Sequence, residues 1–541
     1  MSSPHRPRSG FAFTWTAVDY ALLLILLAST GVFIARRFHF AAHPAEDAAI
    51  LLRYSLHVAQ GHGITWNIDE PPRDGATDFL FMMAVAGLTR AGAAVEMAAR
   101  WIGIAAHLLT LALVYIVSRG FLGAPRWAAL ISALFLACGP GLAYAEAGFG
   151  TPLFAFFACL AGSFLFHEAE AGESRSSAAG FALSAFLCSL TRPEGVFLSA
   201  LLVASLGFYR GWRASRLTIQ FSLILFATAG GLYLAWRWRY FGHLLPTPFL
   251  KKGAGELHTD GLQDSLRNGV ILCLPFLPAF VIGLRSRAAA RRTVAAALPV
   301  AGFLVLWVLL SGEANYLMRF QYAVLPLVLI TWPGLVKGIR EEWLHDLWPQ
   351  LPPGSRRVMV MLLLLAALGA VWYGGRLHRH DANLDDGRYS IAVGLSHLRG
   401  ARSTLATTEA GLLPLYSEWR SIDTWGLNDP WLARHGLSAK FLEEQQPTVI
   451  MFHAYFSPLT TVRGEGDWFQ MTYTLLRYAK DNGYVLAACY GVWPYDTHYY
   501  YVKPNLPETA AIIHLIQRAH YTWLGSPASA LDFAHLGQPR P

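Results

Sequence analysis

Long apolar stretches separated by short polar loops dominate the first 374 residues of this chain. A membrane helix needs about 20 mostly apolar residues, because the hydrocarbon core is about 30 Å thick. Two shorter stretches, 178–191 and 194–209, flank a polar turn at residues 191–195. The pattern predicts a multi-span helical membrane bundle over residues 1–374, with about 11 spans. Besides the short pair, its expected spans lie near residues 17–36, 98–118, 124–144, 150–167, 217–239, 268–284, 294–311, 318–336 and 357–374.

The stretch 77–92 is apolar but short, so it predicts either a further crossing or a re-entrant segment. If it does not cross, the basic loops at residues 210–216, 285–292 and 337–357 all fall on one side of the membrane. The positive-inside rule makes that side the cytoplasm. The opposite, extracytoplasmic side then receives the loop 37–97 and the whole tail that follows the last span.

The tail, residues 375–541, has a different pattern, with turn residues between short alternating segments. Helix-like runs at 467–482 and 508–524 alternate with runs rich in β-branched and aromatic residues, which is typical of a small α/β domain. The strand-like runs are 403–407, 420–424, 448–452, 484–489 and 499–502. We therefore expect an extracytoplasmic α/β domain after the bundle.

Composition supports a membrane protein and narrows its partners. Hydrophobic residues make up 54% of the 541 residues and charged residues only 14%, against about 25% charged in soluble domains. The net charge is +8, but the tail carries 14 Lys+Arg and 15 Asp+Glu. The basic excess therefore flanks the apolar spans and does not form a nucleic-acid-binding patch. The five cysteines include no CxxC pair, so neither a metal centre nor a disulfide framework is indicated.

Acidic side chains gather on the predicted outer side. Glu46 and Asp47 open a segment with helical spacing, so they are either acids that cap a helix or neighbouring carboxylates for general-base work or metal binding. Glu146 ends an apolar stretch, and Glu194 stands beside Arg192 in the turn between the two short stretches. Ionisable groups at the mouth of a membrane bundle are costly and usually functional.

Basic side chains on the same side are candidate ligands for phosphate. Lys251 and Lys252 follow a proline turn on a side where positive charge is disfavoured, so they are either interfacial lysines or phosphate ligands. Arg192 either pairs with a neighbouring acid or binds an anion, and Arg319 is a further candidate at the start of a later span. The outer histidines fit no metal-binding spacing.

Nucleotide-driven and hydrolytic chemistry have no motif here. The chain has no P-loop, no GxSxG and no HExxH, and no GxGxxG opens a helix after a strand. A site on the outer face also has no access to cytoplasmic ATP. Chemistry there needs a substrate that arrives already activated, and a lipid-linked phosphate meets that need.

The order of these motifs resembles the GT-C superfamily of polyprenyl-phosphate-dependent glycosyltransferases. It is most similar to the bacterial branch that includes the mycobacterial terminal arabinofuranosyltransferases. The motifs that carry the resemblance are Glu46-Asp47, Arg53-Tyr54, Gly61-His62-Gly63, Asn67, Asp74-Gly75-Ala76-Thr77-Asp78, Glu146 before Thr151-Pro152-Leu153, Thr191-Arg192-Pro193-Glu194-Gly195, the loop 240–252, Glu409-Ala410-Gly411 and the segment 422–430. Two positions depart from the family pattern, since Glu46 replaces the usual Asp and Asp78 the usual Asn.

The resemblance implies a GT-C-like bundle and an inverting glycosyltransferase in a bacterial inner membrane, with its site on the outer face. The donor would be a polyprenyl-phosphate sugar, such as arabinofuranose or another pentose, and the acceptor an envelope glycan bound by the tail. Asp47 would be the general base, with Glu46 and Glu146 stabilising the sugar cation. Lys251, Lys252, Arg192 and Arg319 would bind the phosphate. The substrate-binding residues would be Arg53, Tyr54, His62, Asn67, Asp74, Thr77, Asp78, Glu194 and His243.

No cofactor is required by this interpretation, although a divalent cation is compatible with it. Three alternatives remain open. In the first, the protein is a glycosyltransferase whose acceptor is an exported protein such as a pilin. In the second, it is a lipid-linked sugar flippase or transporter. In the third, it is a non-catalytic sugar-binding scaffold. A transporter needs ionisable residues near the bilayer midplane, whereas here they crowd one interface.

Overall fold

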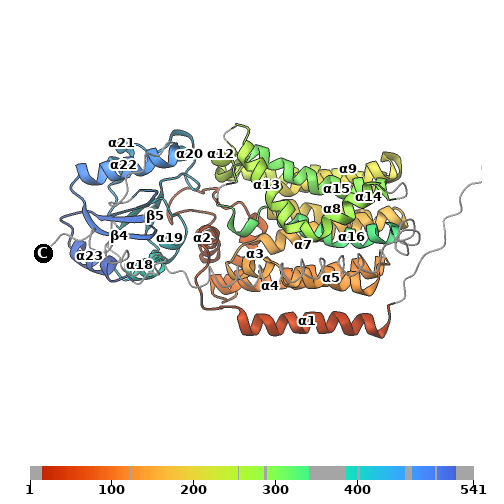
Figure 1. The fold of residues 1–541 in the computed structure, drawn as a ribbon. Helices are drawn as coiled ribbons and strands as arrows, with labels where there is room; N and C mark the ends of the chain where they lie inside the picture. Colours follow the sequence, from red (N-terminus) through yellow and green to blue (C-terminus); the bar gives the residue numbers. More distant parts are fainter. Residues whose placement is uncertain are drawn as a thin grey trace, which may run out of the picture.

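The computed structural model describes residues 15–121, 123–253, 255–285, 289–312, 314–339, 386–398, 403–456, 466–493 and 496–519. Helices make up residues 15–339, which we name the bundle, and a five-stranded sheet with helices makes up residues 386–519, which we name the tail domain. Figure 1 shows the two parts side by side, with helix α2 at their junction. The predicted boundary at 374/375 lies outside the described residues.

The bundle is built from helices that mostly run along one direction (Figure 1). They are α1 (Ala17–Arg37), α2 (Glu46–Gln60), α3 (Phe79–Arg90), α4 (Val95–Ile116), α5 (Arg126–Ala137), α6 (Gly141–Glu146), α7 (Thr151–Ala171), α8 (Arg175–Thr191), α9 (Glu194–Arg210), α10 (Arg216–Leu225), α11 (Gly231–Phe241), α12 (Thr247–Gly253), α13 (Thr259–Cys273), α14 (Leu277–Arg285), α15 (Ala290–Val305) and α16 (Val324–Ile339).

Seven helical segments of the described chain are long and apolar enough to cross a membrane. Each coincides with a stretch predicted from the sequence, so the helical membrane fold is confirmed. The segments are Ala17–Arg37, Val95–Phe121, Arg126–Glu146, Thr151–Ala171, Trp212–Phe241, Thr259–Arg285 and Ala290–Leu309. The total of 11 crossings stays a prediction, because the stretch 357–374 lies outside the described residues and α8 and α9 have only 17 residues each.

The structure decides one open prediction and corrects another among the apolar stretches. The helix α3 has 12 residues, about 18 Å, which is too short to cross a 30 Å hydrocarbon core and favours the re-entrant alternative. The stretch expected to be helical from residue 318 begins its helix only at Val324. Leu317 and Met318 have φ values of 49° and 64°, which a right-handed helix does not allow. The chain therefore forms a turn here, and that turn carries Arg319.

The tail domain has a mixed sheet in the order β2-β1-β3-β5-β4. Its strands are β1 (Thr404–Thr407), β2 (Arg420–Asp423), β3 (Val449–Ala454), β4 (Val485–Trp493) and β5 (Asp496–Val502), each overlapping a predicted strand-like run. Its helices are α18 (Arg388–Ser396), α19 (Leu412–Ser417), α20 (Pro430–His435), α21 (Ala439–Gln445), α22 (Asp467–Asp481) and α23 (Thr509–Gln517). β1, β2 and β3 are parallel, whereas the hairpin of β4 and β5 adds antiparallel strands at one edge.

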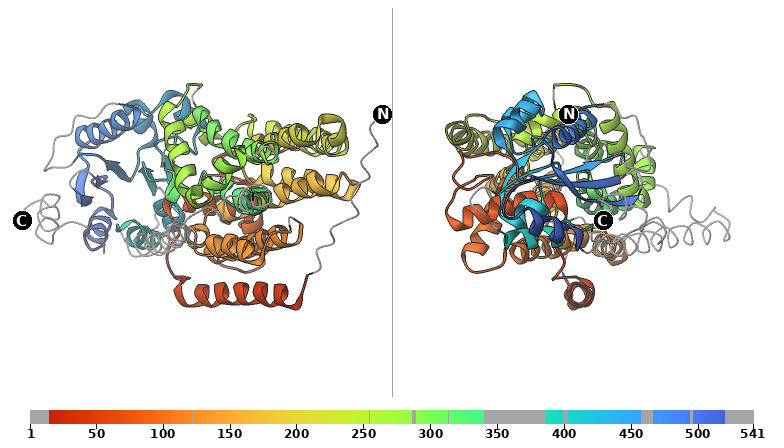
Figure 2. Two further views of the ribbon diagram at one scale, coloured as in Figure 1. Left: turned by 45° about the vertical axis from the view of Figure 1, so that its right-hand side comes forward. Right: turned by 90° about the vertical axis from the view of Figure 1, so that its left-hand side faces the viewer.

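Figure 2 shows the tail domain at one end of the bundle. The carboxyl ends of β1 and β2 face the bundle, because the turns that follow these strands contact bundle residues. The turn after β1 brings Gly411 against α2, and the turn after β2 brings Leu427 to a pocket in the bundle. Loops that follow parallel strands commonly form binding sites, because they meet at one edge of the sheet. The fold thus places the edge of the tail domain over one end of the bundle.

Candidate active site

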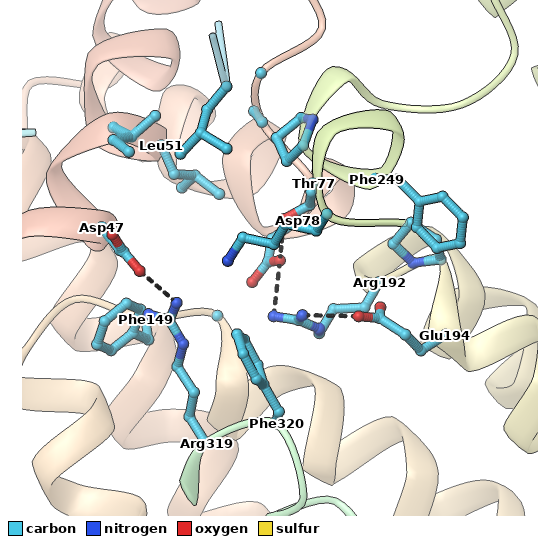
Figure 3. A pocket seen from close by; sticks show the side chains of 18 of the residues that line it. Asp47, Leu51, Thr77, Asp78, Phe149, Arg192, Glu194, Phe249, Arg319 and Phe320 are labelled. Carbon is cyan, nitrogen blue, oxygen red and sulfur yellow. Dashed lines mark hydrogen bonds and ion pairs between the residues drawn. The ribbon is translucent and has the colours of Figure 1, made fainter. Parts of the chain in front are cut away.

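A pocket opens where the bundle meets the tail domain, and Figure 3 shows its side chains. It encloses about 940 Å³ of space, including the open solvent at its mouth. Its walls come from the start of α2, the loop before α3, the turn between α8 and α9, the helix α12 and the turn before α16. Leu427 adds one wall from the tail domain. Segments almost 400 residues apart in sequence therefore build a single site.

Asp47 and Arg319 form the first ion pair of the pocket (Figure 3). The Arg319 guanidinium donates to the Asp47 carboxylate at 2.6 Å. Arg319 is buried, whereas the Asp47 side chain is 33% exposed to the pocket. The Arg319 guanidinium also lies over the rings of Phe149 and Phe320, at 4.1 and 4.9 Å from their centroids. The two rings and the Asp47 carboxylate thus fix the Arg319 guanidinium. The exposed part of the Asp47 carboxylate remains open to a bound molecule.

Arg192 forms a second, more deeply buried cluster with two acids. Its guanidinium donates to Asp78 at 3.2 Å and to Glu194 at 3.0 Å, as Figure 3 shows. Burial raises the pKa of Asp78, although Arg192 counteracts that shift. Burial lowers the pKa of Arg192, but Glu194 and Asp78 together raise it by more, so Arg192 keeps its proton. Arg192 therefore pairs with a neighbouring acid, which was the first alternative. It also lines the pocket, where the second alternative, binding of an anion, stays open.

The two lysines of α12 face different surroundings. Lys252 lines the pocket, and its ammonium lies 5.6 Å from the ring centroid of Phe320. Lys251 instead points to the tail domain, where its ammonium lies 4.1 Å from the centroid of Trp425 and 3.8 Å from the Asp467 carboxylate. The structure therefore brings Lys252, Arg319 and Arg192 together and leaves Lys251 outside their pocket.

Glu46 is the neighbour of Asp47 but does not line the pocket. Its carboxylate accepts hydrogen bonds from the backbone N–H groups of Gly411 and Leu412 in the tail domain. It also pairs with Arg388 at 3.0 Å. No side-chain hydrogen bond caps the N-terminus of α2, although both acids lie in its first turn, where the helix dipole favours them.

Three residues predicted to bind substrate instead join the bundle to the tail domain. The buried Arg53 donates to the carbonyl oxygens of Pro414 and Trp419. The hydroxyl of Tyr54 donates to Asn428 at 3.0 Å. The Asn67 amide both donates to and accepts from the backbone of Ser421, at 3.1 and 2.8 Å. These bonds satisfy buried polar groups across the junction.

Four other predicted substrate-binding residues differ in whether they line the pocket. Thr77 lines it and donates to Asp78 at 3.1 Å. Asp74 is buried beside the pocket, where it pairs with Arg237 and lies 3.8 Å from His243. Burial raises the pKa of Asp74 to about 6. His62 is exposed on the outer loop, and neither it nor His243 lines the pocket.

Glu146 lines a different cavity, between α1 and α5 and α6. Its carboxylate accepts from the backbone N–H of His39 at 2.7 Å and contacts the ring of that histidine at 3.0 Å. The structure therefore does not bring Glu146 together with Asp47 in one pocket. The backbone that follows Glu146 does reach the site, since Gly148 and Phe149 line it.

Several pocket residues carry no chemical motif and were missed from the sequence. The rings of Phe149, Phe249 and Phe320 and the side chain of Leu427 form apolar walls. Phe249 and Leu427 lie within two motifs of the resemblance, the loop 240–252 and the segment 422–430, so those motifs could have indicated them. Phe149 and Phe320 look like ordinary apolar residues in sequence.

A metal ion would need oxygen or nitrogen ligands that converge. Among the described residues, no group of three or more His, Cys, Asp or Glu side chains is arranged to hold one. In the pocket, Arg319 and Arg192 already contact the acids. Metal dependence therefore stays a prediction.

Comparisons with solved structures identify the class of fold. ArnT from Cupriavidus metallidurans bound to undecaprenyl phosphate aligns with a TM-score of 0.57 at 12% identity, over 90% of this chain and 97% of that chain. The oligosaccharyltransferase AglB from Archaeoglobus fulgidus, in complex with an inhibitory peptide and a dolichol-phosphate, aligns with a TM-score of 0.51 at 11% identity, over 91% and 75%. The arabinofuranosyltransferase AftD from Mycobacteria aligns with a TM-score of 0.51 at 17% identity, over 91% and 42%.

This chain therefore has the GT-C fold, as the order of its motifs predicted. Residues 382–503 also match a family model described as a domain of unknown function (DUF8728), which covers most of the described tail domain. No curated protein matches the sequence.

Proposed function

We propose that this protein is an inverting glycosyltransferase that uses a polyprenyl-phosphate sugar as donor. The observation that carries the proposal is the pocket itself, which holds the partly exposed carboxylate of Asp47 together with the cations Arg319 and Lys252. A base for a hydroxyl and positive charge for a leaving phosphate are the two groups that such a transfer needs. ArnT with bound undecaprenyl phosphate and AglB with dolichol-phosphate share the fold and support this donor class.

The proposed reaction gives each of these groups one task. The acceptor oxygen attacks the anomeric carbon, while Asp47 takes the proton of the acceptor hydroxyl. The bond from the anomeric carbon to the phosphate oxygen breaks, and its electron pair leaves with the prenyl phosphate. Lys252 and Arg319 stabilise the charge that develops on that phosphate, because buried cations act strongly where water is excluded. Attack opposite to the leaving group inverts the anomeric centre.

The sugar and acceptor are the finer part of the proposal. An arabinofuranose or another pentose is the donor sugar, supported by the fold shared with AftD. An envelope glycan is the acceptor, and the site lies on the extracytoplasmic side of a bacterial inner membrane. Among the described residues of the pocket, the charged groups gather where the bundle meets the tail domain, which favours surface chemistry over transport across the bilayer.

The activity is tested with purified protein in lipid nanodiscs. Labelled prenyl-phosphate pentose and hexose donors are supplied together with cell-envelope glycan, and the release of prenyl phosphate is followed. We expect release that requires both the acceptor and one class of donor. If no donor is turned over, while labelled prenyl-phosphate sugar instead appears in the lumen of proteoliposomes, the protein is a transporter.

Lys252 and its neighbour Lys251 give a matched test of donor binding. We expect Lys252→Gln to raise the donor KM about tenfold or more, because a charge-assisted contact to phosphate is worth ~1.5–3 kcal/mol. Lys251→Gln removes the same charge one residue away but leaves the pocket unchanged, so its donor KM should stay within about twofold of the original protein. Steady-state kinetics over a range of donor concentrations measures both values. Equal effects of the two variants would contradict the role given to Lys252.

A further inference from the structure

The first turn of α2 holds two adjacent acids with different partners. Asp47 faces the pocket and pairs with Arg319. Glu46 faces the tail domain, where it accepts from the N–H groups of Gly411 and Leu412 and pairs with Arg388. Because consecutive residues share one backbone, the position of Asp47 depends on where Glu46 is held.

Gly411 allows an unusually close approach between the two parts of the protein. A Cβ atom at this position would overlap the carbonyl oxygen of Glu46 and crowd its carboxylate. Only glycine therefore lets the turn after β1 reach the N-terminus of α2. This contact explains the Glu409-Ala410-Gly411 motif, which the proposed chemistry does not otherwise use.

Arg388 holds Glu46 within a buried charge cluster of the tail domain. Its guanidinium contacts the carboxylates of Glu46 at 3.0 Å and Glu409 at 2.6 Å, and it also pairs with Asp386. Glu409 is held in turn by the ring of His453 at 3.0 Å. The partner of Glu46 is thus fixed by other groups and cannot follow α2 if the helix shifts.

The remaining contacts of α2 lie further along the helix. Arg53 and Tyr54 bond to the tail domain about two turns after Glu46. They fix the body of the helix, whereas Glu46 alone, among the described hydrogen bonds and ion pairs, ties the first turn of α2 to the tail domain. The first turn of a helix frays most easily, because its N–H groups lack partners within the helix.

We propose that Glu46 is a positioning residue that sets the place of the base Asp47 by anchoring α2 to the tail domain. The tail domain is then a structural part of the catalytic site and not only a module for acceptor binding. This inference rests on the proposed function for its kinetic consequence, but the anchoring itself is measurable without turnover.

The test compares Glu46→Gln with Glu70→Gln. Glu70 also bridges to the tail domain, through Arg420 at 2.8 Å, but it lies outside α2 and away from the pocket. We expect Glu46→Gln to lower kcat about 10- to 100-fold, because a misplacement of about 1 Å has that effect, while the donor KM stays unchanged. Glu70→Gln should keep both constants. A kcat for Glu46→Gln near the original value overturns the inference, as does a raised donor KM with unchanged kcat.

Two measurements separate anchoring from general loss of structure. Gly411→Ala keeps Glu46 as an acid but forces the turn after β1 away from α2, so it should lower kcat in the same manner. Hydrogen exchange should become faster in the first turn of α2 in Glu46→Gln and remain unchanged in the strands of the tail domain. Unchanged exchange at α2 overturns the anchoring even if wild-type protein turns over no donor. Faster exchange with no turnover retains the anchoring and rejects the proposed function.

The pH profile supplies a readout that a merely structural residue would not change. Burial raises the pKa of Glu46 to about 7, with Arg388 opposing the shift and Glu409 and Asp386 adding to it. As the pH falls through 7, Glu46 takes up a proton and its pairing with Arg388 weakens. We expect kcat of the original protein to fall over that range. The kcat of Glu46→Gln should lack this fall. If kcat of the variant still falls over the same pH range, the titrating group is another residue.

Discussion

Replacing Asp47 with Asn lowers sugar transfer by about 10²- to 10⁴-fold, the contribution typical of a positioned general base. Asparagine has the same shape but accepts no proton at this step. Arg319 can still donate to its amide oxygen, so the pocket keeps its geometry. We therefore expect the loss in kcat, with donor binding largely retained. Kinetics of prenyl phosphate release and equilibrium binding of labelled donor measure the two effects separately.

Asp78→Asn is the matched control, since it makes the same chemical change in the same pocket. Asp78 is buried and engaged by Arg192, whereas Asp47 is open to a bound molecule. Arg192 keeps Glu194 as a partner in this variant. We expect transfer to fall by less than about tenfold. Activity of Asp47→Asn near the original level, or a larger loss in Asp78→Asn, would show that the base lies elsewhere.

Much of the fold could be predicted from the sequence because each element carries its own signal. Apolar stretches of about 20 residues marked the long spans, and all five strand-like runs of the tail proved to be strands. The error at residue 318 arose because the apolar residues Leu317, Met318 and Phe320 lead directly into the apolar helix that follows. Nothing local in Leu317 or Met318 indicates the positive φ values that delay α16 to Val324.

Part of the site could be predicted, because the charge pattern of the loops places the polar residues of the pocket on one side of the membrane. Asp47, Arg192, Lys252 and Arg319 do line one pocket. What the sequence could not reveal is which face of α2 each residue occupies once the tail domain is docked. Arg53 bonds to carbonyls more than 360 residues away, and a buried arginine in such a contact has the same sequence signal as one that binds substrate.

Arg192→Gln should cause a large loss of stability, because it leaves Asp78 and Glu194 buried without their counter-charge. Removing one partner of a buried ion pair typically costs ~3–5 kcal/mol. One carboxylate oxygen of Glu194 already has no hydrogen-bond partner, so the site has little capacity to absorb the change. Thermal and denaturant unfolding of the protein in detergent measures the loss.

The control for Arg192→Gln is Arg267→Gln. Arg267 pairs with Asp264 at 2.9 Å, but both side chains are largely exposed, so the loss of this pair should cost less than about 1 kcal/mol.

The variant Arg192→Gln should also regain stability as the pH falls. Burial already raises the pKa of Asp78, and without Arg192 it rises further. A carboxyl with a raised pKa in the folded state contributes stability at low pH and loses it as the pH rises.

Neutralising the two acids separates charge from shape in the same cluster. If uncompensated charge is the cause, Arg192→Gln combined with Asp78→Asn and Glu194→Gln should recover most of the stability, because a neutral amide cluster at these positions carries no net charge. Transfer should stay low in this triple variant, since the pocket then lacks one of its three cations. Recovered stability without recovered activity would assign Arg192 two roles, one in holding the turn between α8 and α9 and one in the chemistry.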